Sequence, residues 1–197
     1  MKNILLLSLL FFIKICLAQT ELNNYSKNME KFNIQLFKSL AKDDEYTNVL
    51  MDGSIIEQME ISDGFVEKTV FPKEWFYLYK EFYLNGEIRI QGKSFICGDY
   101  KAGVWLVYNE NGKVINQTDY DSEYKLSLDS VLKILEENKV VFSKENKSNK
   151  ITRNIADNKA TWFVQYKLTL DRVEVLNIDD VTGKIIKRSF IKFRSRN

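Results

Sequence analysis

Two Asn-Gly dipeptides, Asn85-Gly86 and Asn111-Gly112, constrain the fold of this chain more than any other feature. An aromatic stretch precedes each dipeptide, an apolar stretch follows it, and the two glycines stand 26 residues apart. Asn-Gly favours a type I′ turn, because both central residues of that turn take positive φ, which Asn and Gly adopt at the least cost. The repetition predicts stacked antiparallel hairpins that share one aromatic face over residues 75–120.

Residues 49–71 continue the β pattern toward the N-terminus. Short apolar pieces at 55–56, 59–61 and 65–71 are separated by Asp52-Gly53 and Asp63-Gly64. Both dipeptides are strong hairpin-turn signals. A β region over residues 49–122 is therefore expected.

The hairpin region carries an ordered set of aromatic, glycine and turn positions: Phe82-Tyr83, Asn85-Gly86, Ile88-Arg89, Gly92, Phe95, Gly103, Trp105, Tyr108, Asn111-Gly112 and Lys113. This order resembles the MORN-type β-hairpin repeat, in the variant common in bacterial envelope proteins. The stretch from Ile96 to Lys101 is slightly longer than the repeat requires. The resemblance implies a β-meander used as a scaffold or contact surface, and it implies no activity.

The last third of the chain has a different pattern. Residues 127–138 predict a helix capped by Ser127 or Asp129, and residues 161–167 and 171–178 predict strands. Residues 179–186 predict a turn and one more strand. The helix, the Trp162-x-Val164-x-Tyr166 pattern and the run Asp180-Val181-Thr182-Gly183-Lys184, within about 126–190, resemble the PepSY family of small α+β modules in exported bacterial proteins. That family is associated with binding and with inhibition of partner proteins.

The first eighteen residues have the features of a secretory signal peptide. A short basic start precedes the apolar run Ile4–Ile13, and Ala18 stands before Gln19. A buried helix or an uncleaved anchor is the alternative. Lipoprotein anchoring at Cys16 is disfavoured, because Lys14 and Ile15 occupy positions where that signal needs small residues. We therefore expect a periplasmic or secreted protein with no transmembrane segment in the mature chain.

The mature chain is expected to be an α+β protein. Apolar residues recur at three- and four-residue steps over 21–42 and predict an amphipathic N-terminal helix. This helix would pack on an antiparallel β-meander, which a helix-plus-antiparallel-sheet module follows. The predicted segments are a signal peptide (1–18), an N-terminal helical segment (19–48), the β-hairpin region (49–122) and the PepSY-like module (123–197). The sequence leaves open whether the last two form one continuous sheet or two domains.

Residue types exclude most catalytic chemistry. The chain has no histidine, and Cys97 is the single cysteine of the mature chain, so histidine-based triads and the usual zinc sets are ruled out. Cys97 follows Phe95 and Ile96, which favours a buried inert thiol over pairing between chains. No cofactor and no metal are expected.

Carboxylates remain as candidates for chemistry. They cluster at 43–45, 119–123 and 179–180, beside predicted turns where Asp commonly bonds its own backbone. The cluster at 119–123 offers oxygen ligands for calcium but lacks the glycine and spacing of an EF-hand loop. The turn interpretation is favoured for all three clusters.

Charge limits the class of partner. The chain carries 29 basic and 27 acidic residues, and removal of Lys2 and Lys14 with the signal leaves 27 of each. This balance argues against binding of nucleic acid or anionic membranes. The basic tail from Lys184 to Arg196 is either a patch for an acidic partner or a final strand whose edge lysines protect it.

These features predict a non-enzymatic protein-binding module, as a monomer or small homo-oligomer. A specific form of this hypothesis is an immunity protein that neutralises a toxin delivered to the periplasm. The alternatives are a structural envelope scaffold without a toxin partner and a carboxylate-based hydrolase of envelope polymers. Aromatic and arginine side chains dominate interface energetics, so the predicted protein-binding residues are Trp75, Phe76, Tyr77, Tyr79, Arg89, Trp105 and Tyr108.

Overall fold

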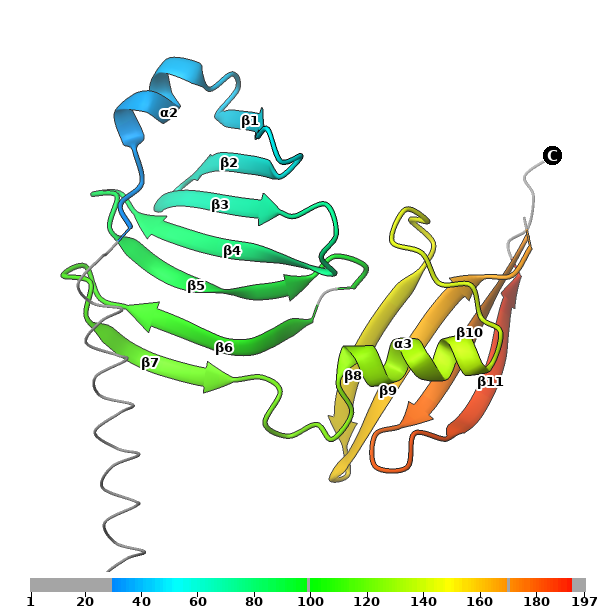
Figure 1. Ribbon diagram of the computed structural model, residues 1–197. Helices are drawn as coiled ribbons and strands as arrows, with labels where there is room; N and C mark the ends of the chain where they lie inside the picture. The colour runs from blue at the N-terminus through cyan, green and yellow to red at the C-terminus, as the bar shows by residue number, and fades with distance from the viewer. Residues whose placement is uncertain (1–29, 99, 170, 193–197) are drawn as a thin grey trace, which may run out of the picture.

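The computed structural model describes residues 30–192 except residues 99 and 170 (Figure 1). These residues form two antiparallel sheets that lie side by side, a first sheet of 7 strands and a second sheet of 4. The predicted signal peptide, and the part of the predicted 21–42 helix that precedes residue 30, lie outside the described residues.

The first sheet is a continuous meander in which each strand pairs with its neighbours in the sequence. The predicted hairpins at 75–120 are present, and the meander also includes residues 45–70. The strands are β1 (Glu45–Val49), β2 (Ile55–Ile61), β3 (Gly64–Val70), β4 (Phe76–Tyr83), β5 (Ile88–Phe95), β6 (Lys101–Tyr108) and β7 (Val114–Asp119).

The Asn-Gly turns lie where the sequence predicts them but differ in type. Gly86 has a φ of 82° and Gly112 a φ of 72°, whereas the asparagine before each keeps a negative φ. The Asn85 side chain accepts a hydrogen bond from the Glu87 backbone at 2.9 Å, which favours this local geometry. The predicted type I′ geometry is therefore wrong at these turns. It occurs instead between β8 (Lys150–Ala156) and β9 (Lys159–Lys167), at Asp157 and Asn158, whose φ angles are 50° and 59°.

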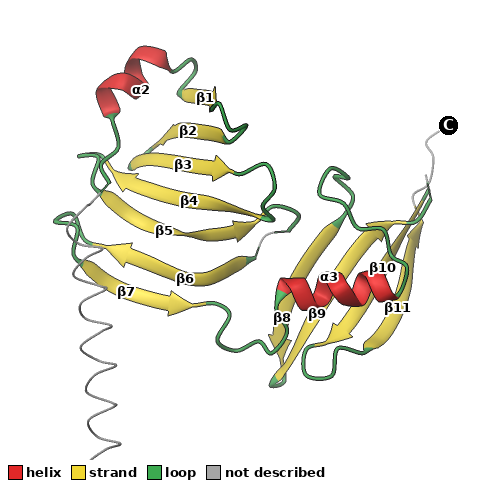
Figure 2. Cartoon of the chain, viewed as in Figure 1, coloured by secondary structure: helices red, strands yellow, loops and turns green. Residues whose placement is uncertain are grey.

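A short helix, α2 (Ile34–Leu40), covers one end of one face of the first sheet (Figure 2). The Asn33 side chain caps the helix by accepting from the Leu36 backbone. Phe32 and Phe37 pack there on Phe65 of β3, with ring centroids 4.6 and 5.6 Å from it. Their cluster also includes Phe82, Ile88 and Tyr108.

The second sheet has α3 (Leu128–Glu137) packed across one face (Figure 1). Ser127 is the N-cap, and Leu128, Val131 and Leu135 are the buried side chains of the helix. The strand order is β11-β10-β9-β8. The strands are β8 (Lys150–Ala156), β9 (Lys159–Lys167), β10 (Arg172–Asp179) and β11 (Ile185–Lys192).

One buried cluster joins the two sheets. Phe95 and Tyr100, from β5 and the loop after it, pack with Trp162 of β9 and with residues of α3. The Ile151 backbone amide of β8 also donates to the carbonyl of Cys97 at 2.8 Å. This core crosses the boundary predicted near residue 122. Cys97 lies within it, so its thiol is buried as predicted, and burial raises its pKa.

The predicted α+β class is wrong, because the protein is mostly β. Strands account for 52% and helices for 11% of the described residues, which form two antiparallel sheets and two helices. Of the helix predicted at 21–42, the described residues form a helix only at Ile34–Leu40. Phe32 is not helical, since its amide donates to the Gly86 carbonyl at 2.9 Å. Three- and four-residue spacing is compatible with a helix, but this part of the chain takes an extended form and pairs with a hairpin.

The two described helices contain 7 and 10 residues. Neither is long and apolar enough to pass through a lipid bilayer.

Candidate interaction surface

The seven predicted binding residues do not share one surface. Trp75 and Phe76 pack into the core between the sheets, where the Phe95 ring lies 6.1 and 5.7 Å from theirs. Tyr108 is buried in the cluster beneath α2. The remaining four, Tyr77, Tyr79, Arg89 and Trp105, lie on the opposite face of the first sheet.

Strand alternation explains this division. Successive side chains of a strand point to opposite faces, so Phe76, Leu78 and Phe82 of β4 lie on the face that α2 covers in part. Both buried clusters of the described residues draw on that covered face of the first sheet. The residues between them lie on the other side, which we call the open face. It includes Lys68, Tyr77, Tyr79, Glu81, Tyr83, Arg89, Lys101 and Trp105.

A hydrogen-bonded network fixes the middle of the open face. The Tyr79 hydroxyl donates to Glu81 at 2.5 Å, and Arg89 donates to Glu81 at 3.1 Å and to Asp63 at 2.6 Å. Burial and the Glu81 carboxylate raise the pKa of Tyr79, so the hydroxyl stays protonated as a donor. The hydrogen bond to Asp63 raises the pKa of Arg89. The Arg89 guanidinium lies 5.6 Å from the centre of the Tyr83 ring.

Trp105 anchors the neighbouring part of the open face. Its ring stacks on Tyr79 at 5.7 Å, and its indole N–H donates to the Lys93 carbonyl at 3.1 Å. The Lys101 ammonium group lies 4.1 Å from the ring centre. A ladder of rings and cations thus crosses three strands, and these contacts hold its side chains in place.

Gly92 makes this ladder possible, because a β-carbon there would lie 2.2 Å from the Trp105 ring. We expect Gly92→Ala to push Trp105 off Tyr79 and to lower the free energy of unfolding by about 2 kcal/mol. Urea denaturation followed by tryptophan fluorescence measures the effect. Ser94→Ala, on the same strand and face, is the control and should change stability little. Equal midpoints for the two variants would show that the stack tolerates the extra carbon.

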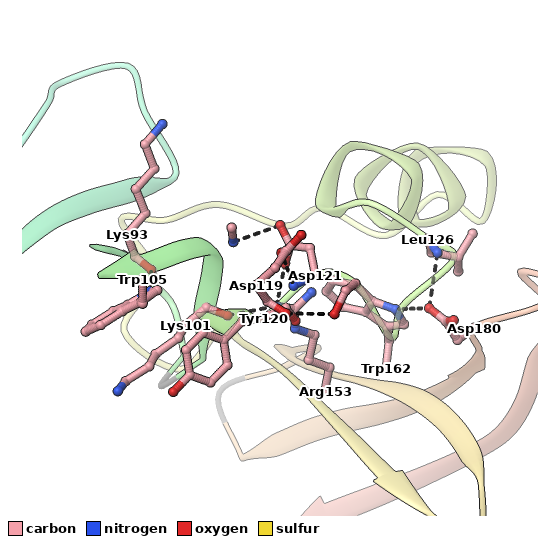
Figure 3. Close-up of polar contacts among 12 residues, drawn as sticks. Lys93, Lys101, Trp105, Asp119, Tyr120, Asp121, Leu126, Arg153, Trp162 and Asp180 are labelled. Atoms are coloured by element: carbon pink, nitrogen blue, oxygen red, sulfur yellow. Dashed lines mark hydrogen bonds and ion pairs between the residues drawn. The ribbon is translucent and has the colours of Figure 1, made fainter. Parts of the chain in front are cut away.

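Arg153 of β8 ties the second sheet to the first (Figure 3). Its guanidinium donates to the carbonyls of Lys101 and Tyr120 at 2.7 and 2.9 Å and to the Asp121 carboxylate at 2.6 Å. The guanidinium carbon also lies 4.6, 4.2 and 5.3 Å from the ring centres of Tyr100, Tyr124 and Trp162. The side chain is only 5% exposed, so this cation does not form a solvent-facing site. It belongs to the contact between the two sheets, which we call the junction.

Asp180 is the second polar centre of the junction (Figure 3). Its carboxylate accepts from the Trp162 indole at 2.8 Å and from the backbone amides of Lys125 and Leu126 at 2.7 and 3.1 Å. The residue is 1% exposed. Asp180 therefore positions the segment that enters α3.

Asp179 and Asp119, two further carboxylates of the predicted clusters, hold turns. Asp179 accepts from the backbone and hydroxyl of Thr182 at 2.8 and 2.7 Å, and these bonds lower its pKa. Asp119 accepts from the Asp121 amide at 3.0 Å. Within residues 30–192, apart from the two omitted positions, no group of three or more acidic or cysteine side chains is placed to hold a metal ion.

The sequence did not indicate the role of Arg153 in holding the two sheets together. This residue stands in a polar strand, β8, that was not predicted, and its partners are more than thirty positions away. Asp180 was noted only as part of a turn. The alternation of residues 161–167 offered one signal, since an indole of Trp162 that points inward needs a hydrogen-bond acceptor.

Comparison with known proteins assigns no family to this chain. No family model matches it, and no curated protein and no solved structure matches it either.

Proposed function

We propose that the chain is an exported, non-enzymatic module that binds a folded protein partner through the open face of its first sheet. The observation that carries this proposal is that the two buried clusters do not lie on the open face. Both described clusters lie on the covered face or at the junction, which leaves the tyrosines and Arg89 of the open face half-buried without a packing layer above them.

The chemistry of the open face suits a protein partner. Tyrosine, tryptophan and arginine are enriched where interface energy concentrates. Rings that are already fixed lose little entropy on binding, and here Tyr79 is held by Glu81 and Trp105. Its charges are mixed, with Lys68, Arg89 and Lys101 beside Glu81, which favours a mixed protein surface over a polyanion.

The residue content and the start of the sequence support the export and the absence of catalysis. The chain contains no histidine, and its first eighteen residues have the pattern of a signal peptide. A small exported binder of this kind fits the role of an immunity protein, whose partner is a toxin delivered to the periplasm.

Binding to a purified partner tests the proposal. The partner is first captured from the native periplasm, then produced separately and titrated by calorimetry against the wild type and variants. We expect a 1:1 complex that Tyr77→Ala and Arg89→Ala each weaken about tenfold or more. Phe190→Ala, which removes a 54% exposed ring from β11, is the matched control and should leave the affinity unchanged.

The biological form of the test uses the same variants. If the partner is a toxin, cells that export the wild type should survive its delivery, and cells that export Tyr77→Ala should not. Unchanged unfolding midpoints would show that the variants remain folded. A complex insensitive to both open-face substitutions would refute docking at this face.

A further inference from the structure

A cavity of about 550 Å³ opens on the covered face of the first sheet, on the side away from the open face. It lies between the β1–β2 turn, the loop after β3, and strands β4 and β5. Its volume is within the range of sites for small ligands. The lining residues are Asp52, Ser54, Phe71, Pro72, Lys73, Glu74, Phe76, Leu78 and Lys93.

The walls of this cavity are held in place by contacts from three parts of the chain. Gly53 turns with a φ of 83°, and a β-carbon there would lie 3.2 Å from the Pro72 ring. The Lys144 ammonium group donates to the carbonyls of Pro72 and Glu74, which ties the loop after β3 to the segment that follows α3. The cavity is therefore formed before a ligand enters.

Its floor is apolar. Phe76 and Leu78 project from β4, and Phe71, which is 38% exposed, stands beside them. An exposed phenylalanine next to two half-buried apolar side chains favours an apolar group in the cavity, since contact would remove all three from water.

A buried serine also lines the cavity. Ser54 is 1% exposed and lines the cavity, yet its Oγ has no hydrogen-bond partner of normal geometry. The neighbouring Asp52 carboxylate accepts from the Ser54 amide at 2.9 Å, and its pKa is lowered by this bond and by the nearby hydroxyl. A buried hydroxyl without a good partner costs free energy, which a polar ligand atom would recover.

Charges of both signs stand at the rim. Among the described residues, the ammonium groups of Lys73 and Lys93 have no ionic partner, and neither does the Glu74 carboxylate. Figure 3 shows the Lys93 side chain extending away from Trp105, whose indole its own backbone holds. Two cations and two carboxylates around an apolar floor match a ligand that carries both charges.

We propose that this cavity binds a short peptide with free ends and apolar side chains. An apolar side chain lies against Phe71 and Leu78. The ligand carboxylate pairs with Lys73 or Lys93, and its ammonium group pairs with Glu74 or Asp52. The Ser54 hydroxyl bonds to a polar atom of the ligand backbone. This site is separate from the open face and does not depend on its partner.

Titration of the isotopically labelled protein with the dipeptide Leu-Phe tests the site by NMR. We expect saturable shifts of the Ser54, Leu78 and Lys93 amides below about 10 mM ligand. Acetyl-Leu-Phe-amide, which lacks both charges, and hexanoate, which lacks the cation, should each bind about tenfold more weakly.

Two variants distinguish a ligand site from a structural hollow. Ser54→Ala should weaken the binding of Leu-Phe about tenfold. The unfolding midpoint should stay constant or rise, because the substitution removes a buried hydroxyl that lacks a good hydrogen-bond partner. Leu78→Trp fills the floor and should abolish binding, whereas Leu84→Trp, at an exposed hairpin tip outside the cavity, should not.

Several results would overturn the proposal. These are the absence of saturable shifts with Leu-Phe, equal binding of the capped dipeptide, and stronger binding of hexanoate. A Ser54→Ala variant with lower stability and unchanged affinity would assign that hydroxyl to the fold alone. None of these results bears on the protein partner of the open face.

Discussion

Replacing Asp180 by alanine is expected to lower the free energy of unfolding by about 4 kcal/mol. The reason is that the carboxylate satisfies three donors at a site that is 1% exposed. Alanine would leave the Trp162 indole N–H and two backbone amides without acceptors, and each buried unsatisfied donor costs about 1–3 kcal/mol. Urea denaturation monitored by circular dichroism measures the loss.

The neighbouring acid provides the control for this prediction. Asp179→Ala removes a carboxylate from a half-buried position at the start of a turn, where it accepts from Thr182, and should cost about 1 kcal/mol. Asp180→Asn keeps the shape but turns an amide N–H₂ toward groups that are themselves donors, so it should recover only part of the loss. If Asp179→Ala and Asp180→Ala had equal effects, the junction role of Asp180 would be wrong.

Replacing Arg153 by alanine is expected to cost about 3 kcal/mol of unfolding free energy and to loosen the contact between the sheets. The substitution removes the donor from the carbonyls of Lys101 and Tyr120 and leaves a space among three aromatic rings. Arg153→Lys keeps the charge without the planar fork, so we expect it to restore less than half of the stability.

Limited proteolysis reports the loosening directly. The segment at 121–126, which joins the two sheets, should be cut faster in Arg153→Ala than in the wild type under native conditions. Arg172→Ala is the control, since this arginine lies 5.3 Å from the Phe190 ring in the same sheet but far from the junction. Equal cutting rates for the wild type, Arg153→Ala and Arg172→Ala would contradict the role of Arg153 in holding the two sheets together.

Local patterns were sufficient to predict the hairpins and α3. Glycines at 53, 86 and 112 take positive φ at the turns that the dipeptides indicate, and Ser127 caps α3 as expected. These features depend on a few neighbouring residues, so a short window of sequence contains what determines them. Turn type was less predictable, because the Asn85 side chain bonds its own loop.

Longer-range features were not predictable in the same way. Trp75, Phe76 and Tyr77 are consecutive aromatics, yet the first two pack in the core and the third lies on the open face. Adjacent Asp179 and Asp180 likewise divide into a half-buried turn acceptor and a buried acceptor at the contact between the sheets. Which of two similar neighbours is buried depends on the second sheet, and no local pattern encodes its approach.

The order of strands in the first sheet has a consequence for how the chain reaches its structure. Closing a hairpin between sequence neighbours confines few residues, so each pairing from β1 to β7 forms at a small entropic cost. The hydrogen bonds of Cys97 to Ile151 and of Lys101 to Arg153 join residues more than 50 positions apart in the sequence. They can form only after the last third of the chain has folded against the first sheet. We therefore expect assembly to run along the chain hairpin by hairpin, with the two sheets joining as the final step.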